Sequence, residues 1–287
     1  MQRLAIGMAG QRNGKGTFET CELGPPRGGR ATGAVDEHGP GRFDIGDLGL
    51  VCHSRDGTPL VASSVVAHLL IAVDFDGTIT MRDTLHVIVD AYGRPGEWDE
   101  LEPALRAGEI TVEQAMEQQF GAVRASHDQV IELVLAQAGT RTGFTDLVSW
   151  AEHARHRVVV ISAGFRCVVD EVLRGLGVGH LEVVANDAVF TTEGCTLVWS
   201  EDRGDTCEIC GRHCKRHAIR ARIDADRLVY VGDGISDRCA SLLADAVFAR
   251  AGLASWLDDQ GVPFTPFDDF HDVIRVLERD LELVEAA

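Results

Sequence analysis

LLIAVDFDGTIT, residues 69–80, is the stretch that indicates the fold most clearly. Its apolar run stops at two carboxylates, Asp74 and Asp76, which stand one residue apart and precede a glycine. A short apolar run bounded by a turn signal is typical of a fully buried strand in a parallel sheet. Ligands of open α/β sheets bind just beyond the carboxyl ends of the strands, so both acids are predicted to lie where chemistry takes place.

The two acids are expected to act together. Side chains alternate along a strand, so Asp74 and Asp76 can lean to the same side while Phe75 points away. Gly77 lets the backbone turn sharply without a steric penalty. Two carboxylates this close repel each other unless a cation lies between them or they share a proton. A hard, oxygen-seeking cation such as Mg²⁺ is therefore expected here.

The composition is that of an ordinary globular protein with an excess of acids. The chain has 287 residues, of which 45% are hydrophobic and 25% charged, enough for one large domain or two smaller ones. Its net charge of -18 argues against nucleic acid or an anionic membrane as the main partner. The eight cysteines follow no secretory signal and no apolar run spans a bilayer, so a cytoplasmic protein with reduced thiols is expected.

The chain divides into an atypical N-terminal segment and an α/β region. Residues 1–65 are rich in Gly, Pro, Arg and Asp without periodicity, and are predicted to be a mostly disordered extension. Residues 66–82 and 144–287 alternate strand and helix patterns, as in a Rossmann-like parallel sheet. Residues 83–143 show apolar side chains at three- and four-residue steps, which predicts an all-helical cap. We also expect helices over 144–153 and from 277 onward, and a hairpin over 182–199.

A small-residue turn, Ser162-Ala163-Gly164, follows a strand predicted over residues 157–161 and feeds a helix predicted over residues 168–176. Backbone N–H groups at such a helix start, together with a hydroxyl, can hold an anion. Ser162 and Ala163 are therefore predicted to bind phosphate. The same pattern also suits an ordinary strand-to-helix turn.

Two later segments complete the set. Lys215 is one of only two lysines in the chain, the other being Lys15. A strand predicted over residues 228–231 runs into GDGISD, in which Asp233 and Asp237 lie one helical turn apart. The acid pair at residues 74 and 76, Ser162, Lys215 and this second acid pair are thus predicted to stand at successive strand ends and to converge at one edge of the sheet.

Taken in order, these segments resemble the four motifs of the haloacid-dehalogenase-like superfamily, over about residues 68–250. The resemblance implies a phosphatase with a Rossmann-like core and Mg²⁺ as cofactor. Asp74, the backbone carbonyl of Asp76 and Asp233 are the implied metal ligands. Asp237 is implied to support the metal through water or through Lys215.

The implied reaction is hydrolysis of a phosphate monoester of a small metabolite. Ser162, Lys215 and the metal neutralise the phosphate so that a nucleophile can approach. Asp74 attacks phosphorus to give an aspartyl-phosphate, while Asp76 protonates the leaving oxygen and later takes a proton from water. Phosphoryl transfer to another acceptor and a catalytically silent binding relative are the alternatives.

The predicted cap resembles that of the phosphoserine-phosphatase-like group. Within this group, Cys210-x-x-x-Cys214-Lys215, preceded by Cys207, is similar to two relatives: the methionine-salvage phosphatase acting on 2-hydroxy-3-keto-5-methylthiopentenyl-1-phosphate, and the phosphoethanolamine/phosphocholine phosphatase. Phosphoserine phosphatases usually carry Ser where this chain has Gly77, and Gly-Gly where it has Ala163 and Gly164. Phosphoserine phosphatase is therefore the second choice.

The cysteines before Lys215 leave two interpretations open. A C-x-x-C with further Cys or His residues is a pattern of zinc sites. However, Lys215 must face the phosphate while the adjacent cysteine faces elsewhere, and no second C-x-x-C follows, so we favour free, reduced cysteines in a tight loop. The residues concerned are Cys207, Cys210, Cys214, His213 and His217.

Substrate selection is expected in the cap and just after the first motif. Asp83 and Thr84 are the nearest to the pocket in sequence, and Glu109, Gln118 and Gln119 are polar candidates in the cap. The protein is expected to be a monomer or a homodimer.

Overall fold

The computed structural model describes residues 20–23, 50–53, 59–60, 68–107 and 109–285. The chain forms two compact units, Met1–Val65 and Val66–Ala287. The described part of the first unit is a three-stranded antiparallel sheet of β1 (Thr20–Leu23), β2 (Leu50–His53) and β3 (Pro59–Leu60). The remainder of the extension predicted to be disordered lies outside the described residues.

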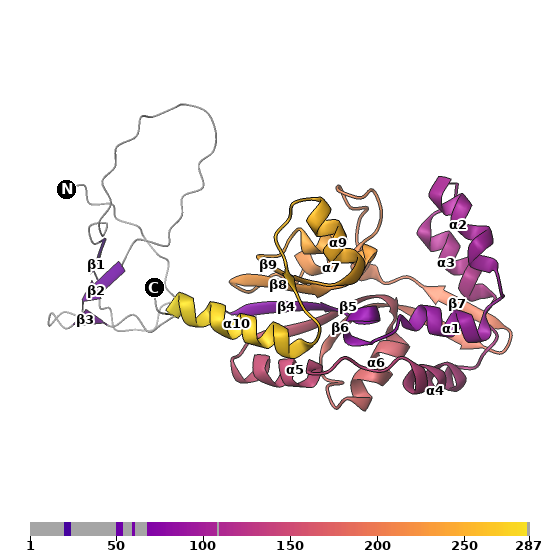
Figure 1. Ribbon diagram of the computed structural model, residues 1–287, viewed down its shortest axis with the longest axis horizontal. Helices are drawn as coiled ribbons and strands as arrows, with labels where there is room; N and C mark the ends of the chain where they lie inside the picture. Colours follow the sequence, from indigo (N-terminus) through magenta and orange to yellow (C-terminus); the bar gives the residue numbers. More distant parts are fainter. Residues whose placement is uncertain (1–19, 24–49, 54–58, 61–67, 108, 286–287) are drawn as a thin grey trace, which may run out of the picture. The chain divides into compact units, whose positions relative to one another are not determined.

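The second unit is built on a seven-stranded sheet (Figure 1). Its strands are β4 (Leu69–Asp74), β5 (Arg157–Phe165), β6 (Glu182–Thr191), β7 (Gly194–Val198), β8 (Arg227–Gly232), β9 (Ala246–Ala249) and β10 (Thr265–Pro266). Their order is β10-β9-β8-β4-β5-β6-β7, and every neighbouring pair is parallel except β6 and β7. The predicted fold class, a Rossmann-like α/β sheet, is confirmed.

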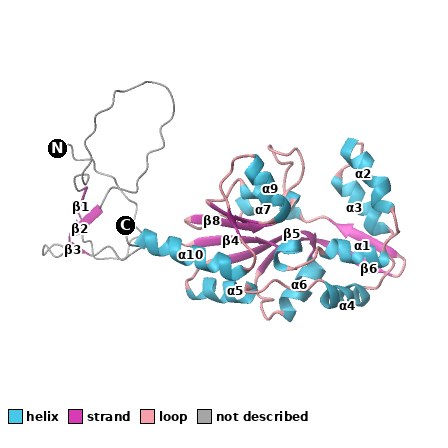
Figure 2. Cartoon of the chain, in the orientation of Figure 1, coloured by secondary structure: helices cyan, strands magenta, loops and turns pink. Residues whose placement is uncertain are grey.

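Helices flank both faces of this sheet (Figure 2). They are α1 (Thr84–Tyr92), α2 (Glu97–Ala107), α3 (Val112–Gly121), α4 (His127–Gln137), α5 (Phe144–His153), α6 (Arg166–Gly175), α7 (Lys215–Arg220), α8 (Arg238–Ser241), α9 (Ala251–Asp259) and α10 (Phe270–Glu285). Helices α5, α6 and α10 lie on one face, and α7 and α9 on the other. Within the described residues, none of the helices combines the length and the apolar character that crossing a membrane requires.

The central strand β4 contributes to two cores because successive side chains of a strand face opposite sides. Leu69, Ile71 and Val73 pack in the core shared with α5, α6 and α10. Leu70 and Ala72 pack in the core shared with α7 and α9. All five are buried, which explains the continuous apolar run in the sequence and anchors the residue that follows, Asp74, at the sheet edge.

The segment between β4 and α5 contains α1 to α4, which lie toward and beyond the carboxyl ends of the strands (Figure 1). The side chains of Thr111 and Ser126 cap α3 and α4 by accepting the backbone N–H groups of Gln114 and Gln129. Helix α3 packs beside β7. Four separate short helices therefore stand next to the sheet edge at which Asp74 ends β4.

The boundaries of α10, β5 and α6 differ from those predicted. Helix α10 begins at Phe270 rather than at residue 277, because Asp269 Oδ1 accepts the N–H groups of His271 and Asp272 and so caps an earlier start. Strand β5 continues to Phe165 instead of ending at residue 161, and α6 begins directly after it.

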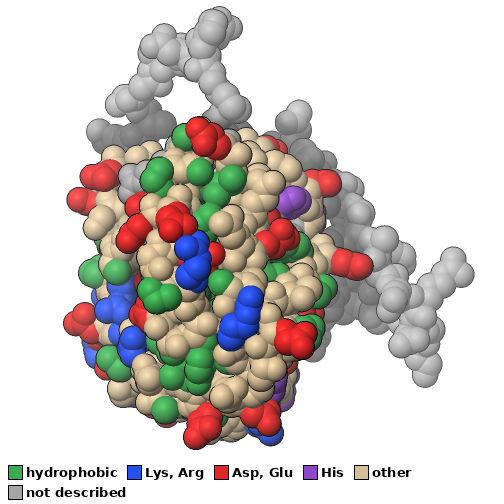
Figure 3. Space-filling view, turned by 90° about the vertical axis from the view of Figure 1, so that its right-hand side faces the viewer, with side chains coloured by type: hydrophobic (Ala, Val, Ile, Leu, Met, Phe, Trp, Pro, Cys, Tyr) green, Lys and Arg blue, Asp and Glu red, His purple; other side chains and the backbone are tan. Residues whose placement is uncertain are grey.

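The surface reflects the acidic composition. Figure 3 looks onto the end of the second unit that carries α1 to α4 and shows acidic side chains spread over this face, with hydrophobic and basic ones between them. This distribution agrees with the net charge of -18.

Candidate active site

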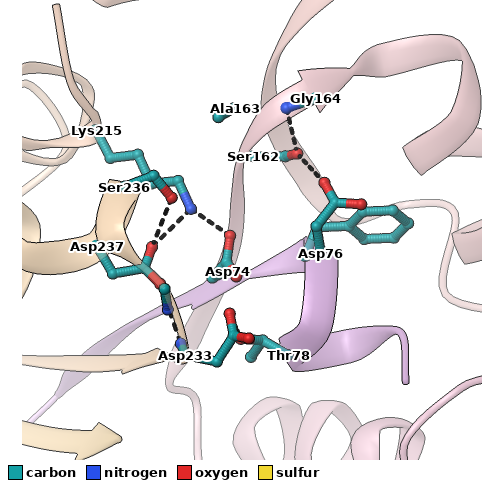
Figure 4. A network of polar contacts seen from close by, with 12 residues as sticks. Asp74, Asp76, Thr78, Ser162, Ala163, Gly164, Lys215, Asp233, Ser236 and Asp237 are labelled. Atoms are coloured by element: carbon teal, nitrogen blue, oxygen red, sulfur yellow. Dashed lines mark hydrogen bonds and ion pairs between the residues drawn. The ribbon is translucent and has the colours of Figure 1, made fainter. Parts of the chain in front are cut away.

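Three neighbouring strands bring the predicted acids and Ser162 to one edge of the sheet (Figure 4). Strand β4 lies between β5 and β8, and its last residue, Asp74, is opposite Ile161, the residue before Ser162. Strand β8 ends at Gly232, next to Asp233. The parallel order of the three strands is thus what makes residues far apart in the chain meet.

Lys215 joins this group from a helix. It is the first residue of α7, and no strand lies between β7 and α7 in this described stretch, so the prediction that all four segments stand at strand ends is wrong for Lys215. Its Nζ contacts Asp74 Oδ1 and lies 2.7 Å from Asp237 Oδ1. Burial alone would lower the pKa of Lys215, but the Asp237 and Asp74 carboxylates outweigh it and raise the pKa.

Asp237 accepts hydrogen bonds on both of its oxygens. Besides the lysine, Oδ1 accepts the Tyr230 hydroxyl at 2.7 Å, and Oδ2 accepts the backbone N–H groups of Asp233 at 3.0 Å and Gly234 at 2.9 Å. Burial opposes the charged form of Asp237, but the Lys215 ammonium and these donors outweigh it and lower the pKa. Asp237 therefore organises the loop around Asp233 and orients Lys215.

Asp74 and Asp233 form the part of the site that suits a cation. One carboxylate oxygen from each of Asp74, Asp233 and Asp237 lies within 4.8 Å of the others. Burial raises the pKa of Asp74 well above its ordinary value, with the Asp237 charge adding to it, and the same two causes raise the pKa of Asp233. Three carboxylates that face one ammonium leave an excess of negative charge, so this oxygen donor set fits a hard divalent cation.

A glycine and two arginines hold the turn that follows β4. Gly77 has a φ of +78°, and a Cβ at this position would collide with the Asp233 carboxylate. Arg141 is 8% exposed and donates from Nη2 to the Gly77 carbonyl at 2.8 Å and from Nε to the Thr78 carbonyl at 2.9 Å. Arg250 Nη1 also donates to the Gly77 carbonyl, at 3.2 Å. These hydrogen bonds and the close approach of Gly77 to Asp233 hold the turn after β4 in a fixed position beside the carboxylates.

Asp76 has its own set of donors on the other side of the turn. Its Oδ1 accepts the Thr84 N–H at 2.9 Å and the Thr84 hydroxyl at 2.5 Å, and its Oδ2 accepts the Ser162 hydroxyl at 3.2 Å. Burial, followed by the Asp83 charge, raises the pKa of Asp76 to about 6, against the opposing effect of the Thr84 donors. Asp76 thus keeps a proton to a higher pH than an ordinary aspartate, as a general acid must.

Ser162 lies in an irregular end of β5 and not in a turn at a helix start, which corrects the prediction for residues 162–164. The register of β5 against β6 shifts between Ile161 and Phe165. Within this irregularity, Ser162 Oγ accepts the Gly164 N–H at 2.8 Å. A bulge of this kind re-aims side chains at the end of a strand, and here it turns the Ser162 hydroxyl toward Asp76.

A cavity of about 390 Å³ opens beside these residues. Ser162, Ala163 and Lys215 line it, together with Val112 and Met116 of α3. The three predicted phosphate-binding residues thus face the same space as the apolar side chains of a helix from the predicted cap.

The residues predicted to select the substrate lie elsewhere. Asp83 caps α1 by accepting the His86 N–H at 3.1 Å, and Thr84 contacts Asp76. Neither is among the described residues that line the cavity, and the same is true of three predicted cap residues, Glu109, Gln118 and Gln119. Thr84 therefore has a place in the site through Asp76 rather than through the cavity wall.

Three site residues escaped the sequence analysis. Tyr230 is the one polar side chain in the apolar run of residues 228–231, and this exception was a usable signal. Arg141 and Arg250 carry no comparable signal, because their carbonyl partners lie 63 to 173 residues away in the chain.

Comparison of the sequence with models of known protein families shows the family to which this arrangement of residues belongs. The family model of the haloacid dehalogenase-like hydrolases matches residues 71–241. The chain belongs to this family. The family predicted from the four motifs is therefore confirmed, and the matched residues of this haloacid dehalogenase-like hydrolase include all of Asp74, Ser162, Lys215, Asp233 and Asp237.

Similar proteins are found in bacilli and among proteins of known structure. A Bacillus cereus protein named 2-hydroxy-3-keto-5-methylthiopentenyl-1-phosphate phosphatase is 31% identical over 213 residues, 73% of this chain and 96% of that protein. A protein of the same name from Bacillus thuringiensis subsp. konkukian is 30% identical over 219 residues, with the same coverage. The structure of a substrate-bound phosphoserine phosphatase has a TM-score of 0.54 and 20% identity, covering 73% of this chain and 98% of that one. This last likeness shows the fold.

Proposed function

We propose that this protein is a Mg²⁺-dependent phosphatase that hydrolyses a small phosphate monoester through an aspartyl-phosphate at Asp74. The observation that carries the proposal is the buried chain Asp74–Lys215–Asp237 beside Asp76. Asp74 contacts the Lys215 ammonium, which favours its charged form against the effect of burial, whereas Asp76 accepts hydrogen bonds from Thr84 and Ser162 and its pKa is raised to about 6. Two carboxyls with such different surroundings suit a nucleophile and a general acid.

The proposed reaction has two steps that balance protons. In the first, an Asp74 oxygen forms a bond to phosphorus as the bond to the leaving oxygen breaks, and Asp76 gives its proton to that oxygen. In the second, water attacks the aspartyl-phosphate and returns a proton to Asp76, which releases phosphate and restores both carboxyls. Lys215 and Ser162 hold the other phosphate oxygens during both steps.

The carboxylates of Asp74 and Asp233 and the backbone carbonyl of Asp76 are proposed to hold Mg²⁺. When bound, this ion supplies positive charge against the phosphate oxygens. Asp237 does not offer a free oxygen to it, because the donors described above occupy both of its oxygens. We assign Asp237 to positioning Lys215 and Asp233.

The proposed substrate is a phosphate monoester of the kind named for the bacillus relatives, and helices α1 to α4 are proposed to form the cap over it. Sequence identity of 31% to those relatives supports this choice. The cavity beside Lys215 adds apolar surface from Met116, Trp199 and Trp256, which suits an uncharged methylthio end. Phosphoserine phosphatase is the second candidate, and it rests on the likeness of the fold.

The test is release of inorganic phosphate from a panel of small phosphomonoesters, with Mg²⁺ or with EDTA. The panel contains 2-hydroxy-3-keto-5-methylthiopentenyl-1-phosphate, phosphoserine and phosphoethanolamine. Asp74→Asn is expected to bind but not turn over, whereas the exposed Asp90→Asn is expected to behave as the unchanged protein. Absence of turnover on every ester, or turnover that EDTA does not affect, would refute the proposal, and a higher kcat/KM for phosphoserine would select the second candidate.

A further inference from the structure

Four cysteines that the proposed reaction does not use gather beside the start of α7. Cys207, Cys210 and Cys214 precede Lys215 in the chain, whereas Cys239 lies in α8. Their four Sγ atoms all lie within 4.8 Å of one another. Cys239 is buried, the other three are half-buried, and all four are free thiols. We call them the cysteine cluster.

We propose that the cysteine cluster binds one structural Zn²⁺ ion. Zinc with four thiolate ligands is tetrahedral, with Zn–S distances of about 2.3 Å, so its sulfur atoms are about 3.8 Å apart. Sulfur atoms that already lie within 4.8 Å of one another reach this geometry by small side-chain rotations. Four protein ligands close the coordination sphere and leave no position for water or substrate, as is typical of structural zinc.

The backbone around the first two ligands is arranged to present sulfur. The Gly211 N–H donates to the Cys207 carbonyl at 2.8 Å, and the Cys207 N–H donates to the Arg212 carbonyl at 2.9 Å, which closes a tight turn. Gly211 permits this turn with a φ of +66°. The Ile209 N–H points at Cys207 Sγ at 3.4 Å. Such donors stabilise a ligating thiolate and fix its direction.

The sequence raises two objections to a zinc site: Cys214 must face away from the adjacent Lys215, and no second C-x-x-C supplies a fourth ligand. The positions of Cys214 and Cys239 in the structure answer both. Cys214 has an extended backbone, with φ of -150° and ψ of 168°, so its side chain and that of Lys215 can point in different directions. Lys215 thus contacts Asp74 while Cys214 joins the cluster. The missing fourth ligand is Cys239, which lies in α8, outside the loop that carries the other three, and shows no metal-site spacing with them.

Positive charge near the cluster suits a zinc–tetrathiolate centre, which carries two negative charges. Arg216 Nη1 donates to the backbone carbonyl of Cys239 at 3.2 Å. The Arg216 guanidinium, which contacts a residue of the cluster, is therefore placed to offset part of the charge of the four thiolates.

The position of the ion gives it a consequence for the active site. Cys214 is adjacent to Lys215, and Cys239 follows Asp237 by two residues. A bound ion would therefore tie together the two segments that carry the 2.7 Å ion pair between Lys215 and Asp237. This inference concerns metal content and stability, so it stands or falls separately from the proposed reaction.

The test is the zinc content of the full-length chain purified without chelators, measured by mass spectrometry. We expect one zinc per chain. Cys214→Ser and Cys239→Ser should lose it, whereas Cys167→Ser, a cysteine outside the cluster, and Asp233→Asn, in the acid site, should keep it. Zinc that disappears with Asp233→Asn would belong to the acid site and would overturn the proposal.

Two measurements on the unchanged chain cover the case in which the serine variants do not fold. Titration with an organomercurial should release zinc in step with the blocking of four thiols, and cobalt substituted for zinc should give the visible bands of a tetrahedral thiolate centre. Protein without zinc whose intact mass is lower by two hydrogens for each cysteine pair would contain disulfides. That result, or four thiols that react freely in protein devoid of metal, would refute the zinc site.

Discussion

Replacing Tyr230 by phenylalanine removes one oxygen atom from the buried network and leaves the packing of the ring unchanged. The Tyr230 hydroxyl donates to Asp237 Oδ1 at 2.7 Å, in a strand residue that is 0% exposed. A hydrogen bond to a charged group contributes about 1.5–3 kcal/mol to stability. The ring stays, so no cavity term is added. The free energy of unfolding should therefore fall by about 2 kcal/mol, which lowers the melting temperature by about 4–8 °C in a domain of this size.

The chain supplies a matched control, because it contains only two tyrosines. The hydroxyl of the other, Tyr92, donates to the Gln129 carbonyl at 3.4 Å, near solvent. Tyr92→Phe should change stability by less than about 0.5 kcal/mol. Asp237→Asn should be the most damaging of the three, by about 3–5 kcal/mol, because it breaks a buried ion pair with Lys215.

The assay is urea unfolding of the three variants and the unchanged protein. Their free energies of unfolding are compared where the dependence of that free energy on urea concentration (the m value) is the same. Tyr230→Phe that is as stable as Tyr92→Phe would show that the hydroxyl does not hold Asp237. Asp237→Asn that is milder than Tyr230→Phe would show that the carboxylate is not the centre of the network. Either result would refute the account of this part of the site.

Three further substitutions test other parts of the protein. Asp76→Asn should slow the hydrolysis of alkyl phosphates by about 10²–10⁴-fold. It should slow the hydrolysis of p-nitrophenyl phosphate much less, because this leaving group needs little protonation. Equal loss of rate on both substrates would argue against Asp76 as the general acid. Gly77→Ala pushes a Cβ against Asp233, so Mg²⁺ affinity by titration calorimetry and turnover should both fall, and unchanged affinity would contradict this. Burial lowers the pKa of His156, so the folded protein binds a proton there less readily than the unfolded chain, and the free energy of unfolding should fall as the pH drops below about 6.5. In urea unfolding, His156→Gln should weaken this pH dependence, whereas the exposed His153→Gln should leave it unchanged. The same pH dependence of stability in both variants would exclude His156 as the cause.

The parts of the fold that the sequence predicts well are those in which local pattern and burial coincide. Strand β4 is buried on both faces, so its apolar run is unbroken and its end is marked by Asp74. Helix α5 has the bounds predicted for it, residues 144–153, because its buried side chains recur at helical spacing. The boundaries of such an element can be predicted from the sequence, because its buried residues and the turn residues at its ends lie in one short stretch of the chain.

The features that escaped prediction depend on contacts between distant segments. The bulge in β5 that turns Ser162 toward Asp76 is set by pairing with β6, which no local pattern shows. Lys215 was found as a motif, but its place at a helix start was not, because the chain before it has no repeating pattern. The approach of Cys239 to the cysteines before Lys215 likewise results from packing of α8 beside α7.

The central claim is that Asp74 carries the phosphoryl group during turnover. The direct measurement is to quench the protein during steady turnover of its best phosphomonoester with Mg²⁺, reduce it with borohydride and sequence the peptides by mass spectrometry. Borohydride converts an aspartyl-phosphate into homoserine, so homoserine is expected at Asp74 and is expected to disappear with EDTA. Turnover that leaves Asp74 unmodified, or modification at Asp76 or Asp233 instead, would contradict the account.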